Sequence, residues 1–273
     1  MSDLQSCFYF QSEMAAPVTH AIAGGEAVVF AVSAPAKQTP NEDAIALIPL
    51  GDRDGVLAVA DGVGGLPGGE QASNLALRRL EAVVREGFLG KEIGLRAAIL
   101  DGIDSANRAL LDEGSAGATT LAVAEIRDGR LRTYHVGDSV ILLTGQRGRI
   151  KLQTIAHSPV GYAVESGILN EREAMEHADR HLIDNVLGAA DMRIEIGPDV
   201  GVSRRDTLLL ATDGLADNLF PEEIVEAIRK GCMDAGAEML CSVSRRRMLE
   251  PREGVPSKPD DLSFITWRPS SPV

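Results

Sequence analysis

The chain has 273 residues, of which 44% are hydrophobic, and a formal net charge of −13 at pH 7. This length is enough to bury one substantial core, so we expect a single domain. The acidic balance, with a pI of about 4.9, argues against nucleic acid and anionic membranes as partners, because the chain lacks the basic excess that displaces their counterions. Clustered acidic side chains can instead serve hard divalent cations, which select carboxylate oxygens.

The cysteines indicate a reducing compartment. There are three, Cys7, Cys232 and Cys241, with no CxxC pair and no spacing typical of a zinc site or a disulfide framework. The N-terminus has no basic start followed by an apolar run, and no apolar stretch reaches the length of about 18 residues that a membrane span needs. We therefore expect a cytoplasmic protein without a membrane-spanning segment.

In chain order, the first half predicts strands followed by two helices. Residues 1–24 have no assignable pattern, and we expect a tail there that can be disordered. Runs rich in β-branched residues, separated by turns that indicate a hairpin, predict strands at 27–33, 44–50 and 56–60. Apolar residues at near-helical spacing predict helices at 70–86 and 93–111. The inward face of the second helix is expected to carry Ile99, Ile103, Ala106 and Leu110.

The second half predicts further strands and shorter helices. Glycine-containing turns separate four successive apolar runs, which we interpret as an antiparallel meander. These runs are 119–126, 131–137, 140–145 and 149–155. Other predicted strands are 193–198, 206–214 and 262–267, and other predicted helices are 171–178, 221–230 and 237–243. Groups of strands followed by helices indicate an α+β fold, in which two antiparallel sheets form a sandwich flanked by helices. We expect this domain to span 25–268, followed by a C-terminal tail at 269–273.

Aspartates recur where predicted strands end. They are Asp43, Asp61, Asp213 and Asp260, with Asp138 as a fifth. A lone Asp-Gly is most often only a tight turn. Several carboxylates brought to one rim of a sheet repel one another unless a cation neutralises them, so the repeated pattern indicates bound metal.

Six motifs occur in an order that resembles the PPM-type (type 2C) metal-dependent serine/threonine protein phosphatases. They are NED at 41–43, VADGVGG at 59–65, GATTL at 117–121, HVGDS at 135–139, LATDGLAD at 210–217 and KPDDLSFI at 258–265. The resemblance covers roughly residues 25–268. It implies a four-layer αββα sandwich, with two Mg²⁺ or Mn²⁺ ions at one end.

The resemblance also implies roles for individual residues. Asp61 would bridge both ions, the Gly62 carbonyl would bind one, and Asp213 and Asp260 would complete the other. Asp43 and Glu42 would act mainly through waters on the ions, and Asp138 would help to hold a third ion. Asp61 and Asp213 would thus be catalytic, because the ions that they hold activate the attacking water. The implied activity is hydrolysis of phosphoserine and phosphothreonine in proteins, opposing a serine/threonine kinase.

The chain departs from the family pattern at two positions. Gln38 stands where many members have the arginine that grips the substrate phosphate, and the adjacent Lys37 is the other candidate for this role. Val63 stands where some members have a histidine that protonates the leaving group. These departures leave two alternatives open, namely a PPM-fold pseudophosphatase that acts as a phosphoprotein or regulatory binding module, and a phosphatase of a small metabolite. Of the histidines that follow the central strands, His157 is the best functional candidate, although a structural role is expected for it.

Overall fold

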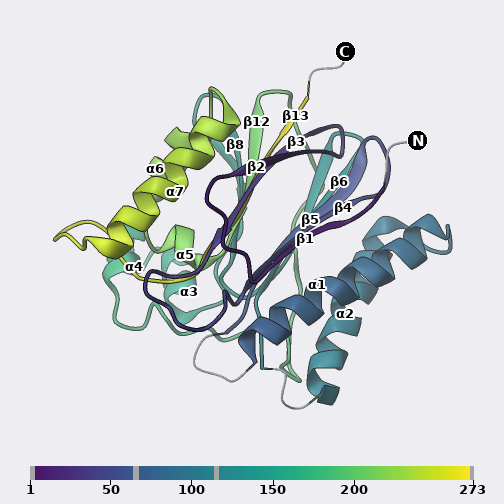
Figure 1. The fold of residues 1–273 in the computed structure, drawn as a ribbon, viewed down its shortest axis with the longest axis horizontal. Helices are drawn as coiled ribbons and strands as arrows, with labels where there is room; N and C mark the ends of the chain where they lie inside the picture. The colour runs from purple at the N-terminus through teal and green to yellow at the C-terminus, as the bar shows by residue number, and fades with distance from the viewer. Residues whose placement is uncertain (1–3, 64–67, 114–116, 271–273) are drawn as a thin grey trace.

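The computed structural model describes residues 4–63, 68–113 and 117–270. In these residues, two antiparallel sheets pack face to face between two layers of helices (Figure 1). Helices α1 and α2 lie on one side of the sandwich, and α6 and α7 lie on the other. This confirms the predicted αββα arrangement.

The first sheet has the strand order β1–β4–β5–β6–β7–β10, and β11 also pairs with β7. Its strands are β1 (Cys7–Phe10), β4 (Asp43–Pro49), β5 (Asp54–Asp61), β6 (Leu121–Arg127), β7 (Arg130–Val136), β10 (Glu195–Ile196) and β11 (Val200–Gly201). Its outer face is covered by α1 (Gly69–Val84) and α2 (Leu95–Glu113), which a π-helical turn at Arg85–Leu89 connects. The predicted inward face of α2 is confirmed, because all four of its residues are buried.

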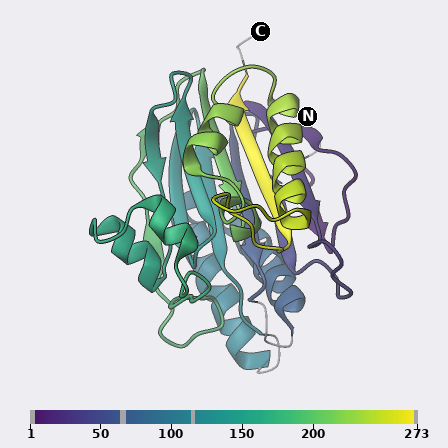
Figure 2. The same cartoon turned by 90° about the vertical axis from the view of Figure 1, so that its left-hand side faces the viewer.

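The second sheet has the order β2–β3–β13–β12–β8–β9. Its strands are β2 (Val18–Ile22), β3 (Gly25–Val32), β13 (Leu262–Pro269), β12 (Asp206–Ala211), β8 (Val140–Gly145) and β9 (Ile150–Gln153). Its outer face packs against α5 (Asp213–Ala216), α6 (Pro221–Ile228) and α7 (Met233–Leu249), which lie in front of the sheet in Figure 2. Two short helices, α3 (Pro159–Glu165) and α4 (Glu171–Glu176), lie in the connection between β9 and β10.

Strand β5 shows why its sequence lacks the alternation of an exposed strand. Val56, Ala58 and Ala60 pack toward α1 and α2, whereas Leu57 and Val59 pack between the sheets. Both faces are buried, so each position from Val56 to Ala60 is apolar. The small alanine side chains on the helix side allow α1 to pack closely on the sheet.

The structure corrects the predicted strand connections. Strands β3 and β4 belong to different sheets, and the hairpin partner of β4 is β5. The predicted meander also divides, because β6 pairs with β7 in one sheet whereas β8 pairs with β9 in the other. The chain crosses between the sheets at residues 137–139. Gly137 has a positive φ of 104° there, a conformation that glycine adopts without strain.

The expectation of a disordered tail at 1–24 is wrong for the described part of that segment. Strand β1 pairs with β4 along an edge of the first sheet, and β2 pairs with β3 along an edge of the second. Their shortness hid them, since a run of four or five residues carries little periodicity. At the other end, Pro269 belongs to β13 and not to a tail. No helix in the described residues combines the length and apolar character needed to cross a bilayer.

Candidate metal centre

Asp43 and Asp61 lie side by side at one end of the first sheet. Asp43 is the first residue of β4 and Asp61 is the last residue of β5, and the two are directly paired in the antiparallel register. Directly opposite residues of an antiparallel pair project from the same face of the sheet. Asp43 is only 1% exposed, and the Thr212 hydroxyl donates a hydrogen bond of 2.9 Å to its Oδ2.

The second sheet supplies two more carboxylates at the same end. Asp213 is the first residue of α5, directly after β12, and Asp260 comes just before β13. Strands β12 and β13 are neighbours, with Ala211 paired to Phe264. Asp138 lies in the crossing from β7 to β8, which joins the two sheets. All five predicted aspartates therefore meet at one end of the sandwich.

The aspartates repel one another, and this repulsion contributes to raised pKa values in the cluster. Burial, followed by the charges of Asp43, Asp213, Asp260 and Asp138, raises the pKa of Asp61 well above its usual value. Burial and then the charge of Asp213 raise the pKa of Asp260 to about 6. Burial and then the charges of Asp213 and Asp217 raise the pKa of Asp138 to about 8. Without a cation, such a cluster holds protons that isolated aspartates would release.

Two of the carboxylates have an oxygen without any hydrogen-bond donor among the described residues. These buried atoms are Oδ1 of Asp43 and Oδ1 of Asp138. An unpaired buried carboxylate oxygen is costly unless a cation binds it. The donor set is carboxylate and carbonyl oxygen, which is the set that Mg²⁺ and Mn²⁺ prefer. The residues present therefore fit hard divalent ions.

A comparison with family models decides the assignment. The model described as protein phosphatase 2C matches residues 32–250. Four of the five aspartates lie within that range, and Asp260 lies just beyond it. The chain belongs to the protein phosphatase 2C family.

Individual relatives agree with this assignment. Protein phosphatase PhpP of Streptococcus pneumoniae is 31% identical over 208 residues, which cover 70% of this chain and 80% of that protein. The structure of the serine/threonine phosphatase PstP/Ppp of Mycobacterium tuberculosis is similar with a TM-score of 0.71 at 25% identity, covering 90% of this chain and 98% of the other. The catalytic domain of the serine/threonine protein phosphatase PstP, solved with two manganese ions, has a TM-score of 0.69 at 24% identity and covers 89% of this chain and 96% of its own.

The predicted family and fold are thereby confirmed, and the chain is a 2C-type, metal-dependent protein phosphatase. Each of these relatives is named as a phosphatase, which supports catalysis over the binding-module alternative.

Gly62 of the VADGVGG motif lies against Gly69, the first residue of α1. A Cβ on Gly62 would come within 2.3 Å of the Gly69 backbone, and a Cβ on Gly69 would come within 2.8 Å of Glu42 Oε1. Only glycine permits this contact, which holds the backbone of Gly62, the residue after Asp61, against the start of α1. The end of the predicted VADGVGG motif, Gly64 and Gly65, lies outside the described residues. Val63 is half-buried, and its N–H donates to Ala118 O at 2.9 Å.

Residues of the GATTL and HVGDS motifs hold the backbone of Asp61 in place through hydrogen bonds. The Thr120 N–H and the Thr119 hydroxyl both donate to Asp61 O at 2.8 Å, and the Asp61 N–H donates to Thr120 Oγ1 at 3.1 Å. The Thr120 hydroxyl in turn lies 2.7 Å from the hydroxyl of Ser139. These residues fix the backbone that carries Asp61 and Asp138. The sequence pattern marked the motifs, but it did not reveal this supporting role.

Of the two candidates for binding phosphate, only Lys37 lies in the centre. Its ammonium donates to Asp261 Oδ2 at 2.6 Å and to Glu42 Oε2 at 2.7 Å. Asp261 also accepts the N–H groups of Ala34 and Glu42, at 2.8 and 2.7 Å. Gln38 is exposed, and its amide bonds to the Ala36 carbonyl instead.

A second lysine, Lys258, lies among carboxylates on the other side of the centre. Its ammonium bonds to Asp213, and it lies 3.0 Å from Asp217 Oδ2 and 3.1 Å from Asp260 Oδ2. Burial alone would lower the pKa of Lys258, but the three carboxylates outweigh burial and raise it. Lys258, Asp217 and Asp261 lie in the motifs at 210–217 and 258–265, but the sequence did not indicate a role for them. The sequence did contain one indication that Asp217 lies near the centre, because Asp213 and Asp217 are four residues apart and four-residue spacing places them on the same face of a helix.

His157 belongs to a buried hydrogen-bond network and not to the metal centre. Its Nδ1 accepts from the Gly137 N–H at 3.0 Å and from the Asn185 amide at 2.8 Å. The proton therefore resides on Nε2, which lies 3.2 Å from Glu195 Oε2. Ligand atoms of His135, His157 and Glu195 lie within 4.8 Å of one another. This tautomer, however, leaves His157 Nε2 without a lone pair for a metal. Its role is structural, as expected, because it ties the β7–β8 crossing to the segment before β10.

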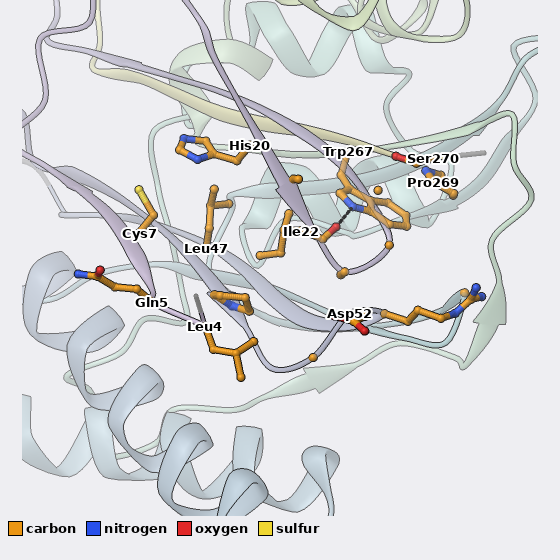
Figure 3. Close-up of a pocket in the computed structure, with 18 residues that line it drawn as sticks. Leu4, Gln5, Cys7, His20, Ile22, Leu47, Asp52, Trp267, Pro269 and Ser270 are labelled. Carbon is orange, nitrogen blue, oxygen red and sulfur yellow. Dashed lines mark hydrogen bonds between the residues drawn. The ribbon is translucent and has the colours of Figure 1, made fainter. Parts of the chain in front are cut away.

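Two hollows differ in their relation to the aspartates. A cavity of about 320 Å³ opens beside Asp138, Asp213 and Asp217, and much of its wall comes from α3, α4 and the segment between β9 and α3. A larger cavity of about 1140 Å³ lies at the opposite end of the sandwich, where the Trp267 Nε1–H donates to Ile22 O at 3.0 Å (Figure 3). None of the five aspartates lines this larger cavity. Of these two cavities, only the smaller one borders the candidate metal centre.

Proposed function

We propose that this phosphatase hydrolyses phosphoserine and phosphothreonine in proteins, using two Mn²⁺ or Mg²⁺ ions held by its aspartates. The observation that carries the proposal is the meeting of five aspartates from both sheets, with buried oxygens of Asp43 and Asp138 free to bind a cation. The serine/threonine specificity follows the names of its relatives, and the ion count follows the manganese complex of PstP.

The ligand roles proposed for the residues follow their positions. Asp61 lies centrally, since its ionisation responds to Asp43, Asp213, Asp260 and Asp138 together, and this suits a bridging role. The Gly62 carbonyl and Asp43 lie on its first-sheet side. Asp213 and Asp260 lie on its second-sheet side. Glu42 and Asp138 would contact the ions through water.

When bound, two divalent ions offset the charge of the phosphate and lower the pKa of a water placed for in-line attack. Asp61 and Asp213 would serve this chemistry by fixing the ion positions. The Thr119 and Thr120 hydrogen bonds to the Asp61 backbone would keep its carboxylate in place. Thr212 would do the same for Asp43. The protein's contribution is thus preorganisation of charge, which costs no rearrangement during the reaction.

Lys37 would assist in holding the phosphate. An ammonium has three protons, and two of those on Lys37 are used by Glu42 and Asp261, so one remains for a phosphate oxygen. The test compares the Lys37→Met/Asp261→Asn double variant with Asp261→Asn alone, so that no buried charge is left unpaired. The double variant should have a KM for a phosphopeptide about tenfold higher. An equal KM would show that Lys37 only neutralises Asp261.

The substrate class is tested by a panel assay with Mn²⁺ and with EDTA. The panel contains phosphothreonine, phosphoserine and phosphotyrosine peptides, together with sugar and nucleotide monophosphates. We expect Mn²⁺-dependent turnover that favours the first two by kcat/KM. A preference for the small metabolites would overturn the protein substrate and leave the metal mechanism standing.

A cognate serine/threonine kinase and a cytoplasmic location complete the proposal. The three thiols are unpaired, which suits a reducing compartment. Cells that lack this chain should accumulate phosphoserine and phosphothreonine on cytoplasmic proteins, and an unchanged phosphoproteome would contradict this part.

A further inference from the structure

Lys258 is held in the centre more completely than a surface lysine. Its ammonium bonds to Asp213 and lies 3.0 Å from Asp217 Oδ2 and 3.1 Å from Asp260 Oδ2, so three carboxylates surround one positive charge. Lys37, in contrast, has two such partners.

The backbone around Lys258 is clamped, so the direction of the side chain is built into the fold. Asn218 is fully buried, and its amide donates to Lys258 O at 2.8 Å while its Oδ1 accepts from the Lys258 N–H at 2.9 Å. The same amide also donates to Gly214 O at 2.9 Å, within α5. Helix α5 and the residue that follows it carry Asp213 and Asp217. One short element therefore positions both the lysine and two of the carboxylates that surround it.

The carboxylates around Lys258 are also those that would hold a metal ion. Asp213 and Asp260 belong to the proposed ligand set, and the ionisation of Asp138 responds to Asp213, Asp217 and Lys258 together. Four carboxylates on this side of the centre are enough to bind a divalent ion. The Lys258 ammonium neutralises part of the charge of these carboxylates and repels a divalent ion from the position that the ammonium occupies.

We propose that Lys258 is a built-in cation of the metal centre, which occupies a position between Asp213, Asp217 and Asp260 that a divalent ion would otherwise take. The chain then works with two exchangeable ions and one tethered positive charge. This inference rests on the proposed two-metal function and adds to it what sets the number of ions.

The test counts Mn²⁺ ions per chain by equilibrium dialysis and metal analysis at saturating Mn²⁺. We expect two ions in the unaltered protein and three in Lys258→Met. The matched control is Lys151→Met, which removes a lysine bonded to the buried Asp206 at 2.6 Å, at the other end of β12. The control should bind two ions. The Lys258→Met/Asp217→Asn double variant should return to two, because it lacks one carboxylate of the new site.

Loss of Lys258 leaves carboxylates unpaired, so Lys258→Gln serves as a second variant that retains a hydrogen-bond donor, and circular dichroism checks the fold of each. We expect three ions in this variant as well. Equal ion numbers in the unaltered protein and in the folded Lys258 variants would overturn the inference, as would three ions in the unaltered protein. Absence of Mn²⁺ binding to the unaltered protein would instead overturn the proposed function.

Discussion

Asp138 illustrates how far its surroundings change a single carboxyl group. Burial, followed by the charges of Asp213 and Asp217, raises its pKa to about 8, and Lys258 only partly opposes this. A group that binds protons more tightly in the folded than in the unfolded state stabilises the fold at low pH, and this stabilisation is lost as pH rises through the folded pKa. The metal-free fold should therefore lose stability as the pH rises toward 8, whereas an aspartate with a lowered pKa stabilises a fold at such pH values.

The metal-free protein should lose stability between pH 6.5 and pH 8. Each pH unit in this window costs up to about 1.4 kcal/mol for one such carboxyl, so the melting temperature should fall by roughly 5 °C. The measurement stays above pH 6.5 because of His135, whose pKa burial lowers to about 3. Below pH 6.5 this histidine makes stability rise with pH, which would mask the effect of Asp138. Thermal melts in EDTA provide the measurement. The Asp138→Asn variant should show a shallower decline, and a melting temperature that rises with pH in the unaltered protein would contradict the argument.

Among individual residues, the sequence predicted the carboxylates of the centre but not the ion pairs between lysines and carboxylates. Asp43, Asp61, Asp138, Asp213 and Asp260 stood out because each lies in a motif next to a strand. The pairings of Lys37 with Asp261 and of Lys258 with Asp217 depend on segments that meet only in the folded chain. Local spacing contains no information about such contacts.

At the scale of elements, most helices and strands were predictable, but their pairing was not. The buried strands are apolar on both faces, so their pattern does not reveal which sheet they join. The crossing at Gly137 therefore looked like an ordinary meander turn. Strands β1 and β2 were missed altogether, although Phe8 and Phe10 pack against the core beneath α1 and the Ile22 carbonyl accepts the Trp267 indole hydrogen bond.

Deletion of residues 1–24 should destabilise the phosphatase. It removes β1 and β2, which exposes the edges of β4 in one sheet and β3 in the other, and exposed edges promote aggregation. The melting temperature should fall by more than about 5 °C, since several kcal/mol of buried contacts are lost. Thermal melting and size-exclusion chromatography test this. A truncated chain that elutes as the full chain does and melts at the same temperature would restore the view that this segment is a dispensable tail.

At the scale of the whole molecule, the centre depends on both sheets at once. The hydrogen bond from Thr212 to Asp43 joins residues 169 positions apart in the chain, and Lys37 reaches Asp261 across 224 positions. A site assembled from such distant segments exists only in the folded protein. Ions that bind only this state stabilise it by mass action, by about 2.7 kcal/mol at a concentration 100 times the Kd.

The most direct test measures Mn²⁺-dependent hydrolysis of a phosphothreonine peptide by the unaltered protein and by the Asp61→Asn variant. Asp54→Asn is the matched control, because Asp54 begins the strand that Asp61 ends. We predict that Mn²⁺ activates the unaltered and control proteins, and that Asp61→Asn lowers kcat/KM by at least about 10³-fold, since several kcal/mol of transition-state stabilisation are lost. Turnover that survives in Asp61→Asn, or that does not respond to Mn²⁺ in the unaltered protein, would contradict a mechanism based on metal ions held by these aspartates.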